Sequence, residues 1–237
     1  YLNNSIAKDS MLTLVHFLEK SGFHLAKLAT PDLQLFETFP KELRAVHDEN
    51  PRHPPDTATV LGVGWNLKSD SLTFDLATVG GKVPNKRKLL SQVAGIFDPV
   101  GLIAFITTPG KLLVQNCFRE GLGWDKVLPD HLRRSVDEWL ARIRSLGEIS
   151  FPRRLTTLSV LQPELQLHVF SDASQFVIAA IAYVLSSAPD GSMDVQPVLA
   201  KTKLAPMKGL TIPRAELTAC VLAARVSCLV QKELNIS

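Results

Sequence analysis

The spacing of hydrophobic residues changes several times along this chain, and each change predicts a different kind of element. Residues 10–27 carry apolar side chains at roughly helical intervals, and Gly22 is expected to end that helix. Residues 41–55 are polar and rich in proline, which is typical of a loop. Two apolar runs follow at 60–65 and 72–74, and the polar residues between them predict a β-hairpin.

The middle of the chain has helical periodicity and predicts three helices. The first begins near residue 86 and is stopped by Asp98-Pro99. The second spans about 102–119 and contains Pro109, which predicts a kink or a break. The third spans 129–146 and presents five apolar side chains on one face, namely Leu132, Val136, Trp139, Leu140 and Ile143. We interpret this region as an all-helical module whose stripes serve packing.

The C-terminal third changes to a strand pattern. Residues 151–154 are interpreted as a connector into a further domain. Apolar and polar residues then alternate from 165 to a strand end at Asp172, and runs at 176–185 and 195–200 predict two more strands joined by a turn. A helix is expected from about 211 to 234, with Pro213 in its first turn. The chain as a whole therefore belongs to the mixed, α+β class.

Two carboxylates occupy positions where phosphodiester chemistry is possible. Asp172 closes the first strand beside the small residues Ala173 and Ser174, and Glu216 lies in the first turns of the last helix. Cleavage by two divalent ions requires carboxylate oxygens that hold the ions about 3.5 to 4 Å apart. Considered separately, each residue has a structural explanation: Asp172 as the turn residue that ends a strand, and Glu216 as a first-turn carboxylate that interacts favourably with the helix dipole. Their order of strand, hairpin, strand and helix favours catalytic and metal-binding roles for both.

Composition adds little to this choice. The chain has 237 residues, 46% of them hydrophobic and 21% charged, which suits one large or two small domains. A net charge of +3 and a pI near 8.8 permit nucleic-acid binding without requiring it. Three cysteines without a CxxC pair, no signal peptide and no apolar run of membrane length predict an intracellular protein, cytoplasmic or nuclear, without disulfide or membrane partners.

Several phrases along the chain are specific enough to compare with known families. The longest, at 86–102, reads KRKLLSQVAGIFDPVGL; the others stand at 21–27, 60–65, 121–125, 168–174, 200–206 and 212–217. Together they resemble the Pol polyprotein of BEL/Pao-type long-terminal-repeat retrotransposons, over nearly the whole chain and in order. The chain begins with Tyr1 rather than Met, which is typical of a segment of a longer protein.

The resemblance implies three regions. Residues 1–84 would be the end of the reverse-transcriptase palm with its β-hairpin, 85–150 a helical thumb or connection, and 151–237 the N-terminal part of a truncated ribonuclease H-like α/β domain. It also implies Mg²⁺ or Mn²⁺ as cofactor. The implied partners are an RNA–DNA hybrid or primer–template duplex and the rest of the Pol polyprotein. The ancestral role would be RNA-templated DNA synthesis and hybrid cleavage.

The chain also departs from the family pattern, and the departures predict lost activity. The polymerase signature Tyr-x-Asp-Asp aligns with Tyr1-Leu2-Asn3-Asn4, where amides would replace both carboxylates and remove the anionic metal ligands. The next ribonuclease H carboxylate of the family lies on a strand after the helix, and no such strand precedes Ser237. We therefore expect a chain that is catalytically incomplete in both activities and binds no metal productively.

Basic residues and alternative functions complete the set of hypotheses. Duplex phosphates are expected to contact Lys86, Arg87, Lys88, Lys201, Lys203 and Arg214. A non-catalytic duplex-binding or Pol-scaffolding module is the first alternative. Two weaker alternatives remain: a Pao-type peptidase, for which no Asp-Thr-Gly or Asp-Ser-Gly is present, and an actin-like phosphotransfer domain, whose phosphate loop would need a glycine after Asp172.

Overall fold

The computed structural model is a mixed helix and sheet protein, as the sequence predicts. It describes residues 4–30, 32–45, 56–60, 63–74, 76, 79–147, 149–158, 160 and 163–236. The chain forms two compact units: Tyr1–Thr73 with Ser150–Arg154, and Phe74–Ile149 with Leu155–Ser237. The helical middle and the C-terminal sheet thus share one unit, while the three-part division at residues 84 and 150 stays a prediction.

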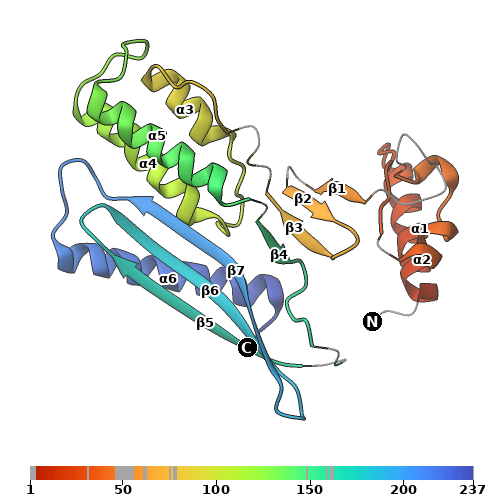
Figure 1. Ribbon diagram of the computed structural model, residues 1–237. Coiled ribbons are helices and arrows are strands. Elements are labelled where there is room, and N and C mark those ends of the chain that lie inside the picture. The colour runs from red at the N-terminus through yellow and green to blue at the C-terminus, as the bar shows by residue number, and fades with distance from the viewer. Residues whose placement is uncertain are drawn as a thin grey trace. The chain divides into compact units, whose positions relative to one another are not determined.

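The first unit combines short helices with a small sheet. Its elements are α1 (Asn4–Lys20), α2 (Leu33–Thr38), the 3₁₀ turn η1 (Lys41–Leu43), β1 (Thr57–Val60), β2 (Val63–Asn66), β3 (Ser71–Thr73) and β4 (Ser150–Pro152). The helix expected before Gly22 is confirmed, although it begins earlier, and Gly22 follows its end with a φ of 80°. The strands pair antiparallel in the order β1-β2-β3-β4 (Figure 1).

Two expectations for this sheet are wrong. The single strand expected at 60–65 is divided into β1 and β2, which pair with each other through Val60 and Val63. The connector expected at 151–154 includes β4, which pairs with β3 through Leu72 and Phe151. Local periodicity does not reveal either feature, because each depends on which segments pair with each other, and β3 and β4 are far apart in sequence.

Asp70 fixes β4 to the hairpin. Its backbone has a φ of 50°, in the turn between β2 and β3. Its carboxylate accepts hydrogen bonds from Trp65 Nε1 at 3.0 Å, from Arg153 Nε at 2.6 Å and from Arg154 Nε at 3.0 Å. Partial burial opposes ionisation, but these hydrogen bonds outweigh it and hold the pKa of Asp70 below its ordinary value.

The second unit opens with the three expected helices. They are α3 (Lys86–Gly95), α4 (Ala104–Arg119) and α5 (Asp130–Ser145), and the five α5 side chains expected to face inward are all buried. Pro109 lies inside α4 without dividing it. Gly110 lets the Trp139 ring approach, since a Cβ at Gly110 would lie 2.6 Å from Trp139 Cζ2. The Trp139 indole donates to the Ile106 carbonyl at 3.0 Å, so the helix stays anchored beside the proline.

The expected three-stranded meander and final helix are also confirmed. β5 (Glu164–Ala173), β6 (Val177–Ser187) and β7 (Met193–Leu204) form one antiparallel sheet in that order, followed by α6 (Ile212–Leu234). α6 covers one face of the sheet and lies behind it in Figure 1. Its inner side packs on alternate β6 residues; the shared core includes Ile178, Ala180, Ala182, Ala219, Leu222 and Val226.

The helical layer contacts β7 through the segment before α4. The Ala200 N–H donates to the Val100 carbonyl at 2.8 Å, so residues around Val100 extend the edge of the sheet. Thr108 Oγ1 also donates to Thr202 Oγ1 at 3.1 Å. The turn at 98–103 is thereby fixed between the sheet and the start of α4.

Within the part of the chain that the structure describes, no helix is both long and apolar enough to cross a membrane. The three cysteines are free thiols; Cys117 is buried, whereas Cys220 and Cys228 are exposed.

Candidate active site

Asp172 lies near the end of β5, as the alternating pattern predicts. It is exposed, stands opposite Ala179 of β6, and its Oδ1 accepts the Ala173 N–H at 2.8 Å. Directly after it, Ser174 Oγ accepts the N–H groups of Phe176 and Val177 at 3.2 and 3.1 Å. The carboxylate therefore sits at the mouth of a tight, hydrogen-bonded reversal rather than in a mobile loop.

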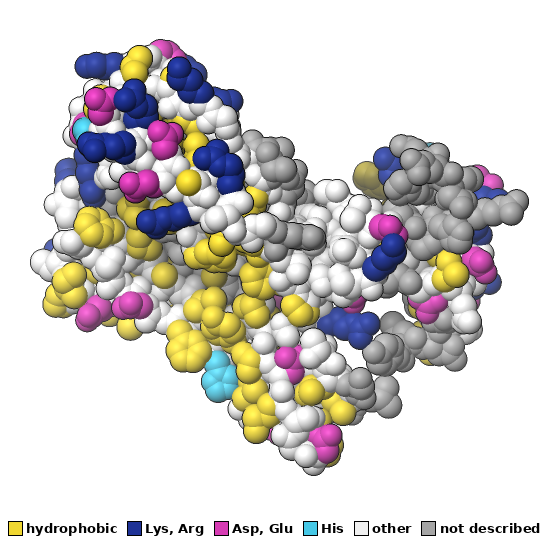
Figure 2. Space-filling model, in the orientation of Figure 1, with side chains coloured by type: hydrophobic (Ala, Val, Ile, Leu, Met, Phe, Trp, Pro, Cys, Tyr) yellow, Lys and Arg dark blue, Asp and Glu magenta, His cyan; other side chains and the backbone are white. Residues whose placement is uncertain are grey.

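The alternation of β5 decides which side Asp172 faces. Leu167, Val169 and Ala173 pack against the core shared with α6. Asp172 has the opposite parity and shares the other face with Phe170. There it borders a hollow of 330 Å³, whose lining includes Gly101, Leu102, Phe105, Phe170, Ile181 and Thr202. Asp172 is the only ionisable residue among those that line this hollow. Figure 2 shows hydrophobic side chains gathered where β5–β7 lie.

Glu216 is placed on the other side of the sheet. It belongs to α6, next to the buried Ala215, and its side chain is exposed. Among the described residues, no hydrogen bond or ion pair joins Glu216 to Asp172, and no group of three or more His, Cys, Asp or Glu side chains is close enough to hold a metal. Two carboxylates from opposite faces are too few oxygen donors for a pair of hard divalent ions. The catalytic and metal-binding roles of both residues stay predictions.

The hairpin carboxylates serve the fold. Asp190 Oδ1 accepts the Ser192 N–H at 2.9 Å and the Ser192 hydroxyl at 2.6 Å, and these bonds lower the pKa of Asp190. Asp194 Oδ2 accepts the Thr157 N–H at 2.6 Å and the Thr157 hydroxyl at 2.9 Å. Burial opposes ionisation of Asp194, but these bonds outweigh it and lower its pKa.

Lys86, which the sequence predicts to contact duplex phosphates, is buried and has partners within the protein. Its side chain is only 4% exposed, and Nζ donates to the Leu122 carbonyl. Nζ also lies 4.0 Å from the centroid of the Phe118 ring and 4.6 Å from that of Trp124. The ammonium therefore links α3 to the loop after α4 through cation–π contacts. Phe118 and Trp124 are far from Lys86 in sequence, so the basic run at 86–88 alone does not predict these contacts.

Its neighbours remain at the surface. The Arg87 guanidinium forms a two-pronged pair with Asp125, at 2.8 and 2.9 Å, which raises the pKa of Arg87 and lowers that of Asp125. Lys88 is exposed. An exposed pair of this kind contributes little to stability, so Arg87 can exchange its partner at small cost.

The other predicted basic residues are exposed but divided between surfaces. Lys201 and Lys203 stand opposite Ala180 and Ile178, so they lie on the α6 face of the sheet. Arg214 is exposed on α6 itself. Arg153 and Arg154 belong to the first unit and bind Asp70. The structure therefore places three of the six predicted contacts, Lys201, Lys203 and Arg214, on the side of Glu216 rather than that of Asp172.

Asp98 is a partly buried carboxylate that the sequence does not single out. One carboxylate oxygen accepts the Ile103 N–H at 3.1 Å and caps the turn before α4, while the other is buried without a partner among the described residues. Burial raises the pKa of Asp98 despite this capping. Asp98, Lys111 and Thr107 line a polar cavity of 170 Å³. The sequence feature that could have indicated this carboxylate is the turn sequence Asp-Pro-Val-Gly at 98–101, which predicts only the end of a helix.

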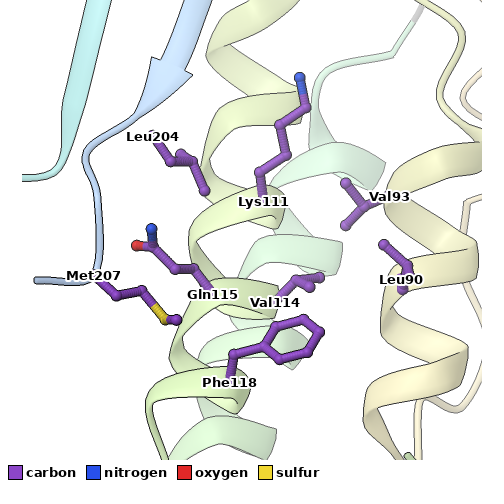
Figure 3. A pocket seen from close by; sticks show the side chains of 8 residues that line it. All are labelled: Leu90, Val93, Lys111, Val114, Gln115, Phe118, Leu204 and Met207. Carbon is purple, nitrogen blue, oxygen red and sulfur yellow. The ribbon is translucent and has the colours of Figure 1, made fainter.

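A larger cavity has no carboxylate among its lining residues. It has a volume of 380 Å³ and lies between α3, α4 and the segment after β7 (Figure 3). Its walls are mostly apolar, with Lys111 and Gln115 as its polar side chains, and none of its lining residues is a carboxylate. It is therefore not a candidate for metal-dependent catalysis.

Comparison with known proteins agrees with the resemblance. A family model described as the Pao retrotransposon-like RNaseH-like domain matches residues 85–237, which begin at the N-cap of α3 and include β5–β7 and α6. No curated protein matches the chain. The match covers more than half of the chain and contains both predicted carboxylates. The chain therefore belongs to the Pao retrotransposon-like RNaseH-like domain family.

Proposed function

We propose that this chain is the part of a Pao-type Pol polyprotein that joins the end of the reverse transcriptase to the first part of ribonuclease H. The observation that supports this most is the order of β5, β6, β7 and α6, with Asp172 at the end of the first strand, in a chain of the Pao family. A ribonuclease H-type carboxylate is expected at that strand end, where side chains are accessible at the edge of the sheet.

The polymerase part of the proposal rests on residues 1–84. Tyr1 and Asn3 of the degenerate signature lie outside the described residues, and the backbone of Asn4 begins α1. Asparagine in place of the metal-binding carboxylates would leave the ions without anionic ligands. We therefore expect no DNA synthesis from this chain.

Asp172 and Glu216 are the proposed carboxylates of a divalent-metal site for hybrid cleavage, and among the described residues neither belongs to a group of three or more possible ligands. When bound, Mg²⁺ or Mn²⁺ would activate water and stabilise the leaving oxygen. Because Asp172 faces away from α6 and no third carboxylate joins either residue among those described, the chain favours binding without cleavage. We therefore propose duplex binding, or scaffolding within Pol, for the isolated chain.

A binding measurement tests this function. Fluorescence anisotropy would follow a labelled RNA–DNA hybrid titrated with the chain at several salt concentrations. Each phosphate contact contributes about 0.9 to the slope of log K against log salt for a B-form duplex. Replacing Lys201, Lys203 and Arg214 by serine should lower the affinity by about tenfold or more and reduce the slope by about two to three.

The control removes the same charge elsewhere. Arg134, Arg142 and Arg144 are exposed on α5, outside the proposed surface. Their replacement by serine should weaken binding much less. Equal losses in the two triple variants, or no hybrid binding by the unmodified chain, would contradict the proposed surface.

A further inference from the structure

α6 is apolar on two opposite sides. Its inner side is buried against the sheet through Ala215, Ala219, Leu222, Val226 and Val230. Its outer side also carries apolar residues, which are exposed: Leu217 (66%), Val221 (46%), Ala224 and Cys228. A helix that covers a sheet normally has a polar outer side. The outer residues therefore indicate a surface that another element covers.

The outer residues are spaced as a helix-packing seam. Leu217, Val221, Ala224 and Cys228 follow one another at intervals of four, three and four residues. At 100° per residue they fall within an arc of about 60°, opposite the buried side. A 4-3-4 spacing is the pattern by which one helix packs along another at a shallow angle, and the small Ala224 allows close approach at its centre. We refer to these four residues as the outer stripe.

Charge along the edges of the outer stripe selects the kind of helix. Arg214, Arg225 and Lys232 are exposed and lie along one edge, 11 and 7 residues apart. The other edge carries Cys220, Ser227 and Gln231, which are uncharged. Glu216 lies farther around the helix on that second side. A partner helix would therefore meet three cations along one edge and no charge along the other.

We propose that the outer stripe of α6 docks an amphipathic helix of a protein partner whose apolar residues are bordered by Asp or Glu. Acidic side chains beside the partner's seam would pair with Arg214, Arg225 and Lys232, in the way that flanking charges select partners in coiled coils. The proposal concerns the side of α6 that faces away from Asp172 and is independent of any nuclease activity.

The charges also disfavour two other occupants of the outer stripe, a second copy of α6 and a nucleic acid. An antiparallel pair of α6 helices centred on Ala224 would bring Arg214 of one copy near Lys232 of the other, which is repulsive. A nucleic-acid backbone would be attracted by the basic edge, but the outer stripe offers its phosphates no hydrogen-bond donor. An acidic amphipathic helix satisfies both the apolar and the charged features.

The test uses the full chain and a synthetic three-heptad peptide with leucine at the seam positions and glutamate at both flanking positions. A second peptide has lysine in place of each glutamate. Fluorescence anisotropy should show the acidic peptide binding at least about tenfold tighter than the basic one, a difference of about 1.4 kcal/mol. Leu217→Ser combined with Val221→Ser should abolish that binding.

Two further variants make the result specific. Leu229→Ser is the matched control, because Leu229 is on the same helix and 46% exposed but lies outside the outer stripe; it should bind the acidic peptide normally. Arg225→Glu should reduce the preference for the acidic peptide and improve binding of the basic one. Circular dichroism would verify that each variant is folded.

Three outcomes would overturn the proposal. The first is the absence of acidic-peptide binding, or an equal loss in the Leu229→Ser control. The second is self-association of the chain, by analytical ultracentrifugation, that Leu217→Ser disrupts, which would make a second copy the occupant. The third is competition by a DNA duplex that depends on Arg225 and Lys232, which lie outside the proposed hybrid-binding surface, but not on Leu217; this would make the outer stripe a nucleic-acid surface.

Discussion

The two faces of the β5–β7 sheet differ in how completely they are covered. On the α6 face, Ile178, Ala180 and Ala182 are almost inaccessible to solvent. On the opposite face, Phe170 is 59% exposed and pairs edge-to-face with Tyr183, with 6.1 Å between ring centroids. Both faces are apolar, yet only one forms a core. The comparison shows that an apolar run predicts a sheet well but does not identify what covers each side.

The two faces also differ in the kind of residue that they carry, since one holds packing residues and the other holds Asp172. Small residues of β6 let α6 approach closely, and the face they form carries no carboxylate from β5. Asp172 lies on the open face, beside a hollow that the turn before α4 partly closes. The most destabilising substitutions should therefore fall on the α6 face, whereas changes around Asp172 should affect ligands more than folding.

The largest expected effect compares two adjacent alanines of β6. Ala180 belongs to the core shared with α6 and is 2% exposed, whereas its neighbour Ala179 stands opposite Asp172 on the other face of the sheet. Ala180→Asn would bury an amide without a partner and overfill the core, so it should lower the free energy of unfolding by about 3 kcal/mol. Ala179→Asn should lower it by less than about 1 kcal/mol. Urea unfolding would measure both; similar losses would refute the assignment of faces.

The next effect concerns the turn that borders the open face. Gly101 has a φ of 78°, and a Cβ there would overlap the carbonyl oxygen of Ala200 on β7. Gly101→Ala should therefore cost about 2 to 3 kcal/mol. Gly121→Ala is the control, because Gly121 has a φ of 66° but free space around its Cβ position, and should cost about 1 kcal/mol. If both variants unfold at the same urea concentration, the turn is not pressed against β7.

The smallest effect is a pH dependence from Asp98. Burial raises the pKa of this carboxyl in the folded state, so the folded protein holds the proton more tightly than the unfolded chain does. Stability from this group is therefore present below the unfolded pKa of about 3.9 and is lost as pH rises through the folded pKa. Asp98→Asn keeps an acceptor for the Ile103 N–H and removes the buried charge.

Comparing Asp98→Asn with the unmodified chain isolates the contribution of the Asp98 carboxyl to the pH dependence of stability. The stability of Asp98→Asn relative to the unmodified chain should increase from pH 4 to pH 7, by about 1 kcal/mol or less. Thermal unfolding at several pH values would measure it, with Asp98→Ala as the variant that also loses the cap. A relative stability that falls over this range would mean that the ionised carboxylate stabilises the turn.

Sequence reasoning found the elements of the second unit because each has strong periodicity of its own. The five inward residues of α5 and the alternation of β5 are local signals, so they predicted the helix, the strand and the position of Asp172. Prediction was weaker for features that depend on distant partners. β4 pairs with β3 although α3, α4 and α5 all lie between them in sequence. Lys86 is buried against Phe118 and Trp124, which follow it by more than 30 residues.

The sequence predicts which residues belong to the candidate site, but not how they are arranged in space. The order of strands and helix identified Asp172 and Glu216, yet which face each occupies follows from the register and from the packing of α6. The sequence predicts only a helix stop at Asp98, because the hydrogen bond from the Ile103 N–H to its carboxylate depends on the fold of the turn. The family itself was recognisable because its phrases are long, and the match to residues 85–237 confirms it.

An assay of RNA–DNA hybrid cleavage by the 237-residue chain would show whether Asp172 belongs to an incomplete or a complete site. The chain would be incubated with a labelled RNA–DNA hybrid and Mg²⁺, beside an Asp172→Asn variant that matches it in size and fold. Because the described residues include no group of three or more possible metal ligands, both proteins should leave the RNA intact at equal background. Mg²⁺-dependent cleavage by the unmodified chain that Asp172→Asn abolishes would contradict it, and would show that Asp172 belongs to a complete site.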